Sequence, residues 1–442
     1  MCHLIFPFSN VTVLSSISSA TGKLAVTSAC SMSTSEILHS AQDEPELRSG
    51  PTQTSIVVGV TDPQTCMVLG PRLRALREAG FKVTLVASPG DLLEDTAASE
   101  GVEARAVPMK RELAPLADLL SLVRLWMLLG RLRPDLVEFS TPKAGLLGGL
   151  AALLRGVPRR IYVLRGLRLE SATGFKLRAM LIGERISAAC AHVVLCNSVS
   201  LRKKALELGV AWPAKLKLLG NGSSIGVDTR RFAPGPSGVR DQLGLGSEAQ
   251  VIGFVGRLTR DKGVPELFEA FHSILDAVPT AYLMLVGWFD ESEDALGWNL
   301  RARIQNHPRI HMTGYVRDTA PYYRAMDLMV LPTWREGFPN VALEAAATEI
   351  PVVTTLSTGS RDAVVPEVTG LLIPPGLPEA ISEAVLKLLG DPERRQRMGR
   401  SARAWVQQHY AEDRILGLTT AFYENLLKPG SGMEPGSDTH KG

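Results

Sequence analysis

Short apolar runs alternate with longer amphipathic stretches along most of this chain. The short runs are rich in valine, isoleucine and leucine and predict buried strands, and the longer stretches have apolar residues at helical spacing. Apolar strands that alternate with helices predict parallel βαβ units whose sheets are covered on both faces. The predicted strands are residues 55–60, 81–87, 101–107, 135–139, 159–164 and 192–196, followed by 251–255, 281–286, 309–312, 328–331, 351–354 and 369–373.

A segment rich in proline and glycine, residues 232–238, separates the two series of strands and predicts a domain boundary. We therefore predict two doubly wound, Rossmann-like domains, residues 55–235 and 236–428. Two such domains in tandem would leave a cleft between the carboxyl ends of their sheets, where this kind of fold binds ligands. The amphipathic stretch 392–427 predicts a final helix that packs back on the hinge.

The two ends of the chain differ from this pattern. Residues 1–54 are apolar and rich in serine and threonine, but they lack the basic start of a signal peptide. We interpret them as a disordered tail that folding does not need. Residues 429–442 predict a second disordered tail.

The stretch Leu113–Leu132 allows two interpretations. Its leucines and Trp126 have the spacing of a helix with a core-facing stripe, formed by Leu119, Leu122, Val123, Trp126 and Leu129. Alternatively, basic residues of the first domain could face an anionic membrane surface; these are Arg124, Arg131, Arg133, Arg165, Arg168, Lys176 and Arg178. Asp118 and Arg124 interrupt the stretch, so it does not predict a membrane-spanning helix.

Composition excludes several classes of protein. The 48 basic and 45 acidic residues give a net charge of +3, which does not indicate a nucleic-acid partner. Five cysteines without a CxxC pair are typical of a reduced, cytoplasmic protein. The histidines have no zinc-site spacing, and Asp-x-Asp is absent, so we expect no bound metal. The first predicted βα turn has no G-x-G-x-x-G, which argues against a dinucleotide cofactor.

The most informative segment is Arg335–Glu344, which follows the predicted strand at 328–331 and opens a helix. A carboxylate lies on each side of a loop of glycine, phenylalanine and proline. Pro339 suits the first turn of a helix, where its missing N–H is not needed. The backbone amides around Phe338 and Asn340 would point out of the helix N-terminus and could bind phosphate. Together, amides and carboxylates could hold the phosphate and the hydroxyls of a nucleotide sugar.

The wording of this segment, Glu336-Gly-Phe-Pro-Asn-Val-Ala-Leu-Glu344, closely resembles the EX7E signature of family 4 of the retaining glycosyltransferases, which have the GT-B fold. The resemblance extends over roughly residues 55–425 and is strongest to members that build capsule, O-antigen and glycan precursors. It implies that Glu344 binds the ribose of the donor and that Glu336 contacts the donor sugar. It also implies that the loop of Gly337, Phe338, Pro339 and Asn340 contacts the donor, with its free amides facing sugar and phosphate.

A second motif opens the second domain. Gly256 and Arg257 follow the predicted strand at 251–255, and Lys262 lies just before the next helix. Two cations on such a loop suit a diphosphate, whose charge increases as the glycosidic bond breaks. The pattern G-R-L-x-x-x-K-G is similar to the family motif that places this arginine and lysine on the donor diphosphate. The segment that ends at Val316 resembles the family loop whose backbone meets the nucleobase.

In the first domain, Lys143 and Arg165 each follow a predicted strand and resemble residues near the cleft in the same family. Many members have His-Gly where this chain has Arg165-Gly166. An arginine cannot act as a base near neutral pH, so Arg165 could only position groups or stabilise charge. Ordinary surface charge explains both residues equally well.

The resemblance implies a metal-independent, retaining hexosyltransferase that uses a nucleotide diphosphate-sugar, expected to be a UDP-sugar, and no other cofactor. The implied acceptor is a glycan or a polyprenyl-diphosphate-linked sugar in cell-surface polysaccharide synthesis. We expect the protein in the cytoplasm, in peripheral contact with the cytoplasmic face of the membrane. Two alternatives stay open, a nucleotide-sugar epimerase of the same fold and a non-catalytic scaffold that binds nucleotide sugars.

Overall fold

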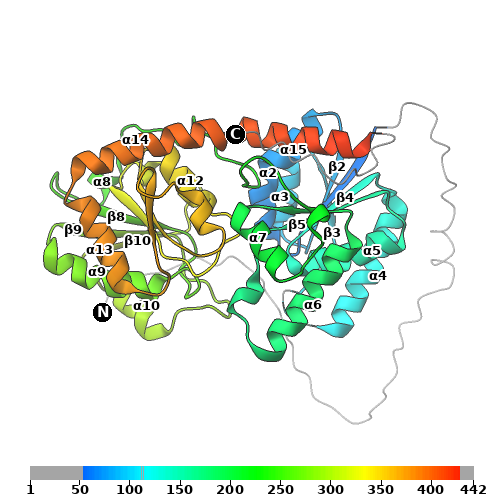
Figure 1. Cartoon of the computed structure of the whole chain (residues 1–442), viewed down its shortest axis with the longest axis horizontal. Helices are drawn as coiled ribbons and strands as arrows, with labels where there is room; N and C mark the ends of the chain where they lie inside the picture. The colour runs from blue at the N-terminus through cyan, green and yellow to red at the C-terminus, as the bar shows by residue number, and fades with distance from the viewer. Residues whose placement is uncertain (1–52, 111, 113, 429–442) are drawn as a thin grey trace, which may run out of the picture. The chain divides into compact units, whose positions relative to one another are not determined.

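The chain builds two separate parallel sheets in the computed structural model, which describes residues 53–428 except Arg111 and Leu113 (Figure 1). Each sheet is covered by helices, and we call each sheet with its helices a lobe. This arrangement confirms the predicted α/β fold with two doubly wound domains. The predicted tails lie outside the described residues, apart from Gln53 and Thr54, which hydrogen bond with Gly80 and Lys82.

The first lobe contains a seven-stranded sheet in the order β3-β2-β1-β4-β5-β6-β7, with all neighbouring strands parallel. Its interior strand β1 is buried on both faces, which explains its unbroken apolar sequence. The strands are β1 (Ser55–Gly59), β2 (Lys82–Ala87), β3 (Glu103–Ala106), β4 (Leu136–Ser140), β5 (Arg159–Leu164), β6 (Val193–Cys196) and β7 (Leu216–Leu218).

Helices pack on both faces of the first sheet. On one face, Leu69 and Leu73 of α2 and Leu93 of α3 share a buried cluster with residues of β1 and β2. On the other face, α4, α5 and α6 lie side by side, with α5 between the other two. The helical elements are α2 (Pro63–Glu78), α3 (Asp91–Glu100), α4 (Pro115–Leu132), α5 (Pro142–Leu154), η1 (Arg168–Ser171), α6 (Gly174–Cys190), α7 (Val199–Glu207) and η2 (Pro213–Lys215).

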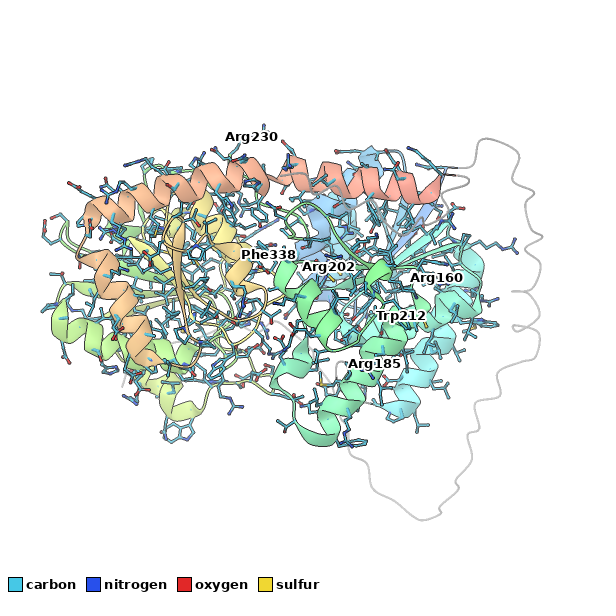
Figure 2. The ribbon with its side chains drawn as sticks, in the orientation of Figure 1. Arg160, Arg185, Arg202, Trp212, Arg230 and Phe338 are labelled. Carbon is cyan, nitrogen blue, oxygen red and sulfur yellow. The ribbon has the colours of Figure 1, made fainter. Side chains whose placement is uncertain are left out.

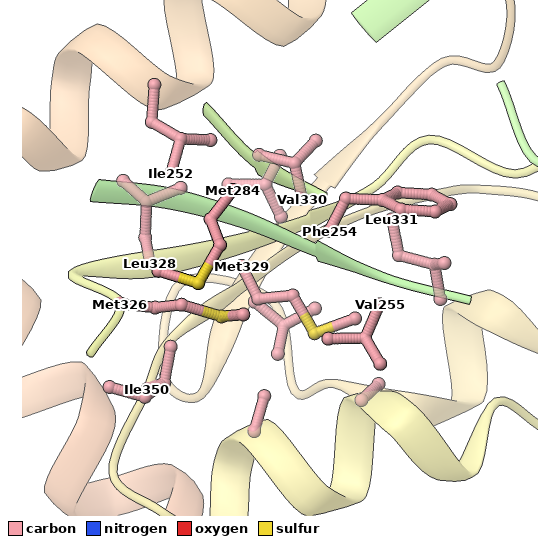
Figure 3. Packing of buried hydrophobic residues seen from close by; sticks show 14 of the residues in the cluster. Ile252, Phe254, Val255, Met284, Met326, Leu328, Met329, Val330, Leu331 and Ile350 are labelled. Atoms are coloured by element: carbon pink, nitrogen blue, oxygen red, sulfur yellow. The ribbon is translucent and has the colours of Figure 1, made fainter. Parts of the chain in front are cut away.

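The second lobe contains a six-stranded parallel sheet in the order β10-β9-β8-β11-β12-β13. Phe254, Met284 and Met329 lie in its core between sheet and helices (Figure 3). Its strands are β8 (Gln250–Val255), β9 (Ala281–Val286), β10 (Ile310–Gly314), β11 (Leu328–Leu331), β12 (Val352–Thr355) and β13 (Gly370–Ile373). Its helical elements are α8 (Val239–Gln242), α9 (Val264–Ala277), α10 (Trp298–Gln305), α11 (Ala320–Tyr323), α12 (Asn340–Ala347), η3 (Ser360–Ala363), α13 (Pro378–Leu389) and α14 (Pro392–His409).

Both sheets reverse their strand order at one point, between β1 and β4 in the first lobe and between β8 and β11 in the second. The connections that leave the carboxyl ends of such neighbouring strands diverge, and this opens a crevice for a ligand. The two motifs singled out in the sequence directly follow β8 and β11. The topology therefore brings both motifs to the same crevice.

The stretch 392–427 is two helices, α14 and α15 (Glu412–Leu427), so the prediction of one continuous helix is wrong. The break follows Tyr410, because Val227 binds there: its amide donates to the Tyr410 carbonyl, and its own carbonyl accepts from the Glu412 amide. After the break, α15 packs on α2 of the first lobe (Figure 1). Tyr423 of α15 is buried in the core cluster of that lobe.

Helix α2 begins at Pro63, with Asp62 as its N-cap. Helix α4 corrects the sequence prediction. The predicted core stripe of α4 is wrong in part. Leu129 is buried and Leu122 is half-buried against the core, as predicted, but Ser121 and Leu125 complete the buried side. Leu119, Val123 and Trp126 are exposed. The helix is apolar on nearly every side, so its pattern could not decide which face is buried.

Glu184 on α6 makes the stability of the protein depend on pH. The carboxylate is buried and accepts a hydrogen bond of 2.7 Å from the Tyr162 hydroxyl. Burial raises the pKa of Glu184 from 4.5 to about 7. Between these values the folded protein keeps a proton that the unfolded chain has lost, so the free energy of unfolding falls as pH rises from 4.5 to about 7.

We therefore expect Glu184→Gln to stabilise the protein at pH above 7, by on the order of 3 kcal/mol, and to have little effect below pH 4.5. Urea denaturation of wild type and variant across this pH range measures the difference. Glu383→Gln, at an exposed position on α13, is the matched control. Parallel pH profiles for wild type and Glu184→Gln would contradict the prediction.

Candidate active site

Residues of both lobes line one cleft of about 700 Å³ at the carboxyl ends of the two sheets. The second lobe contributes the loops after β8 and β11, and the first lobe contributes the start of α2. The cleft contains Arg257, Lys262 and Glu336, three of the residues predicted from sequence. The lining residues are Gln64, Met67, Val68, Leu92, Val255, Gly256, Arg257, Lys262, Trp288, Tyr315, Leu331, Glu336, Phe338, Pro339, Asn340 and Val341.

The loop between β11 and α12 is fixed at both ends. The Glu336 amide donates to the Thr358 carbonyl at 3.1 Å. Phe338 is buried, its ring packs against Tyr410 with centroids 5.2 Å apart, and it lies where the two lobes face each other (Figure 2). These anchors hold the loop rigidly beside the cleft.

Helix α12 begins at Asn340, so Pro339 is its N-cap residue and lies just before the first turn, not in it. In the described part of the chain, the amides of Phe338, Asn340 and Val341 donate no hydrogen bond. All three residues line the cleft. Free amides at a helix N-terminus form an anion site, so this end of the cleft suits a phosphate group.

Both cations of the cleft are paired with carboxylates. Lys262 forms an ion pair with Glu336, and Arg257 forms one with Asp290, which follows β9. The Lys262 and Glu336 side chains are 18% and 15% exposed, so water screens their attraction only in part. A diphosphate that enters the cleft would compete with these carboxylates for the two cations.

Glu344 lies one turn into α12 and is not among the residues that line the cleft. Its carboxylate accepts a hydrogen bond of 2.8 Å from the hydroxyl of Tyr323 on α11. Burial raises the pKa of Glu344, while this hydrogen bond and the charge of Arg231 act in the opposite direction. The structure thus holds Glu344 in one orientation at the edge of the site.

Arg165 follows β5 and lines a second, smaller cavity of about 310 Å³ beside the first. Its Nε donates to the Ser140 hydroxyl at 3.0 Å, and its buried Nη2 has no partner among the described residues. Burial and the nearby charge of Arg72 lower the pKa of Arg165 to about 10. The guanidinium is still protonated at neutral pH, so it can hold an anion or hydroxyl but cannot accept a proton.

Backbone atoms of the two lobes meet beside this cavity. A side chain at Gly337 would place its Cβ only 1.5 Å from the Arg165 carbonyl oxygen. Gly166 in turn approaches the Gly337 amide, where a Cβ would lie at 3.3 Å. Glycine at position 337 therefore permits the signature loop to touch the first lobe.

Hydrogen bonds between side chains continue the contact between the lobes. The Ser200 amide and hydroxyl, at the start of α7, both donate to the Asp362 carboxylate of η3, at 2.9 Å and 2.5 Å. The Thr358 hydroxyl donates to Glu170 at 2.7 Å. Each buried apolar cluster of the described residues, in contrast, lies within the elements of one lobe and α14 or α15. The lobes thus meet through polar groups.

Besides Glu344, two predicted residues line neither cavity. Lys143 forms an ion pair with Asp118 at 2.6 Å and donates to the Glu112 carbonyl at 2.8 Å, which ties it to the start of α4. Val316 packs against the core of the second lobe. Neither residue lines a cavity, and their role in binding substrate stays a prediction.

Sequence reasoning missed Trp288, Asp290 and Tyr323, and it included Tyr315 only as part of the segment that ends at Val316. Trp288 and Tyr315 line the cleft, with their rings in edge contact at 5.5 Å. Each directly follows a glycine at the end of a strand, Gly287 after β9 or Gly314 of β10, and these glycines were the signal that the sequence offered. Asp290 positions Arg257, and Tyr323 positions Glu344. Nothing in the sequence indicates either pairing.

Several other features of the described residues bear on chemistry. They contain no group of three or more His, Cys, Asp or Glu side chains that could hold a metal ion. No described helix has both the length and the apolar character needed to cross a bilayer. Cys66, Cys190 and Cys196 are buried free thiols.

Comparison with known proteins identifies the family. Residues 249–391 match the family model described as "Glycosyl transferases group 1", and residues 72–222 match that of a "Glycosyl transferase 4-like domain". The chain is 33% identical over 374 residues to the capsular polysaccharide biosynthesis glycosyltransferase CapM of Staphylococcus aureus, which covers 84% of this chain and 97% of CapM. The chain belongs to the group 1 glycosyltransferases.

Two further comparisons agree with this family. This glycosyltransferase is 28% identical over 300 residues, 66% of its length, to 76% of the UDP-Gal:alpha-D-GlcNAc-diphosphoundecaprenol alpha-1,3-galactosyltransferase of Escherichia coli. The solved structure of Anabaena HepE in complex with UDP has a TM-score of 0.70 and 18% identity, and covers 84% of this chain and 100% of that one. That likeness confirms the GT-B fold, and the family confirms the resemblance drawn from the EX7E segment.

Proposed function

We propose that this glycosyltransferase moves a sugar from a UDP-sugar to a glycan or polyprenyl-diphosphate-linked acceptor in surface-polysaccharide synthesis. We further propose that the reaction retains the anomeric configuration and needs no divalent metal. One observation carries the proposal: Arg257, Lys262, Glu336 and the free amides before α12 share one cleft. The Escherichia coli galactosyltransferase supports the choice of donor and acceptor class, since its name states a UDP-sugar donor and a diphosphoundecaprenol-linked acceptor. CapM supports the role in surface-polysaccharide synthesis, which its name states.

In this proposal the donor diphosphate lies between the α12 amides and the two cations. Lys262 and Arg257 exchange carboxylate partners for phosphate oxygens, and the released Glu336 accepts hydrogen bonds from hydroxyls of the donor sugar. Glu344, held by Tyr323, accepts hydrogen bonds from the ribose. The ring pair Trp288 and Tyr315 offers an apolar wall for the nucleobase.

The reaction breaks the bond between the sugar C1 and the diphosphate oxygen, and it forms a bond from C1 to the acceptor oxygen. Lys262 and Arg257 stabilise the negative charge that grows on the departing diphosphate. The acceptor proton passes to a departing phosphate oxygen, so the acceptor attacks from the side that the diphosphate leaves, with retention.

The composition of the cavities supports this front-face route. Among the described lining residues of both cavities, Glu336 is the one carboxylate, and histidine and cysteine are absent. A double displacement through a covalent sugar would need a nucleophile in addition to a base. Arg165 is protonated and cannot be the base.

The second cavity is the proposed place of the acceptor. Polar groups of the first lobe line it, with Asn197 and Ser224 suited to sugar hydroxyls and Arg165 suited to an anionic group. An epimerase of the same fold would have no use for such an acceptor site. Because a polyprenyl chain stays in the bilayer, we include peripheral contact with the membrane in the proposal.

We expect the purified protein to release UDP slowly from at least one UDP-sugar by hydrolysis, and to do so in excess EDTA. The measurement is a screen of UDP-sugars with UDP release as the readout, followed by the anomeric configuration of any transfer product. Activity that EDTA abolishes and manganese restores would show that a metal replaces the proposed cations. Release from nucleotide sugars of another base, and from no UDP-sugar, would contradict the choice of donor.

A further inference from the structure

The outward surface of α4 is unusually apolar for a helix at a protein surface. Six large apolar side chains on it are exposed, and Leu116 at its start is 82% exposed. With about 100° of rotation per residue, they fall within an arc of about 120° opposite the buried Leu125. These six residues are Leu116, Leu119, Leu120, Val123, Trp126 and Met127.

Exposed apolar side chains are also present on the two neighbouring helices, α5 and α6. Helix α5 lies between α4 and α6, and Leu153 and Leu154 at its end are exposed. On α6, Phe175, Ile182 and Ile186 are exposed at helical spacing, Phe175 by 86%. We call the outward surface of these three helices the α4–α6 face. Exposed apolar side chains gathered on neighbouring helices of a folded domain mark a contact surface.

The exposed and unpaired charges on these three helices are all basic. The three helices contain two acidic residues, Asp118, which is paired with Lys143, and Glu184, which is buried. Arg124 and Arg131 of α4 and Arg178 of α6 are exposed and have no ion pair among the described residues. Arg155, at the end of α5, lies over the Trp126 ring at 3.3 Å. An apolar face with a cationic border complements an anionic lipid surface, with apolar groups at the acyl boundary and arginines among headgroups.

The α4–α6 face reaches the edge of the lobe where the acceptor cavity lies. Helices α4, α5 and α6 begin at the carboxyl edge of the first sheet, because α5 directly follows β4 and Lys143 at its start binds the start of α4. Phe175 follows η1, whose Glu170 contacts Thr358 of the second lobe. The two most exposed apolar residues of this face, Leu116 and Phe175, therefore lie at its cleft end.

We propose that the α4–α6 face docks this glycosyltransferase on a bilayer that contains anionic lipid. The inference deepens the proposed function, on which it rests for a lipid-linked acceptor, by naming the surface that meets the membrane. Docked in this way, the cleft end of the face lies at the headgroups, next to where a polyprenyl diphosphate would emerge.

The test is flotation of the full chain with vesicles, either of phosphatidylcholine alone or with one third of the lipid replaced by phosphatidylglycerol. We expect binding to the anionic vesicles that weakens as salt is added. Arg124→Glu/Arg131→Glu should reduce vesicle binding at least about tenfold, since each basic residue near such a surface raises the membrane affinity about fivefold. Separately, Leu116→Ser/Leu120→Ser should also reduce vesicle binding at least about tenfold, because it removes apolar groups from the acyl boundary. All four positions are exposed, so the variants should fold.

Matched controls lie in the second lobe. Trp298→Ser removes an equally exposed apolar residue, and Arg397→Glu/Arg400→Glu reverses the same amount of charge on α14. Neither should change vesicle binding. Equal loss in the controls, or no binding by the wild type, would overturn the proposal. So would a wild-type dimer that Leu116→Ser/Leu120→Ser dissociates while vesicle binding is absent, because the face would then join two copies.

A second readout separates this proposal from the proposed function. UDP release by hydrolysis needs no membrane, so the α4 variants should retain it. If they hydrolyse the donor normally but bind vesicles as the wild type does, the docking proposal is wrong and the proposed function stands. If vesicles bind as expected but no UDP-sugar is hydrolysed, the docking surface stands and the donor assignment fails.

Discussion

Replacing Lys262 by alanine is expected to lower turnover by about 10²–10³-fold and to weaken UDP binding by about tenfold or more. The two effects differ because the diphosphate is charged when bound and gains more charge as the glycosidic bond breaks. The variant also leaves Glu336 without its cation, so an unpaired carboxylate would face the phosphates. Calorimetric titration with UDP and the rate of UDP release measure the two effects separately.

Lys203→Ala is the control for this experiment, since Lys203 is exposed on α7 and lines neither cavity. It should leave both quantities unchanged. A Lys262→Ala variant with normal UDP affinity and normal turnover would remove the lysine from the donor site. Normal affinity with lost turnover would instead place it on the reacting sugar alone.

The two glutamates of the signature are expected to respond differently to the same substitution. Glu336→Gln should lower turnover at least about tenfold but leave UDP affinity unchanged or tighter, because it frees Lys262 from the ion pair that competes with phosphate. Glu344→Gln should weaken UDP binding by about tenfold or more, since it removes a charge-assisted hydrogen bond to the ribose. Titration of both variants with UDP, beside their turnover rates, measures the difference.

The UDP affinities of the two glutamate variants test the roles assigned to Glu336 and Glu344. Equal loss of UDP affinity in the two variants would falsify the division between sugar and ribose, though not the donor site. Tighter UDP binding by Glu336→Gln would show that Glu336 competes with the diphosphate for Lys262 in the wild type. Tyr323→Phe offers a further comparison, because it removes the hydrogen bond that orients Glu344 without touching its charge.

Sequence could predict most of the fold because buried parallel strands are apolar throughout and therefore stand out. β11 and β9 have the bounds expected from their apolar runs. The wrong predictions have a common cause, which is that contacts with a segment distant in sequence determine the local structure. The break between α14 and α15 depends on Val227, and no residue near Tyr410 announces it. The buried side of α4 depends on what packs against it, since its own pattern is apolar nearly all round.

The candidate site shows the same division. Glu336, Arg257 and Lys262 could be named in advance, because each lies in a local motif directly after a strand. Their pairing could not, because Lys262 and Glu336 are 74 positions apart and Arg257 and Asp290 are 33 apart. Lys143 likewise does not line the cleft because it binds Asp118, which lies 25 positions earlier in the sequence.

The polar contact between the lobes has a consequence for how the enzyme works. If the lobes separate, groups such as Ser200 and Asp362 lose their hydrogen bonds to each other and form hydrogen bonds with water. Each such hydrogen bond between the lobes therefore stabilises their contact by only about 1 kcal/mol net. No apolar core shared by the two sheets has to be exposed. We therefore expect the lobes to separate at a low free-energy cost, and a donor that binds both lobes would favour the arrangement in which they touch. When the nucleoside diphosphate dissociates, this preference is lost, and the lobes can separate again before the next acceptor binds.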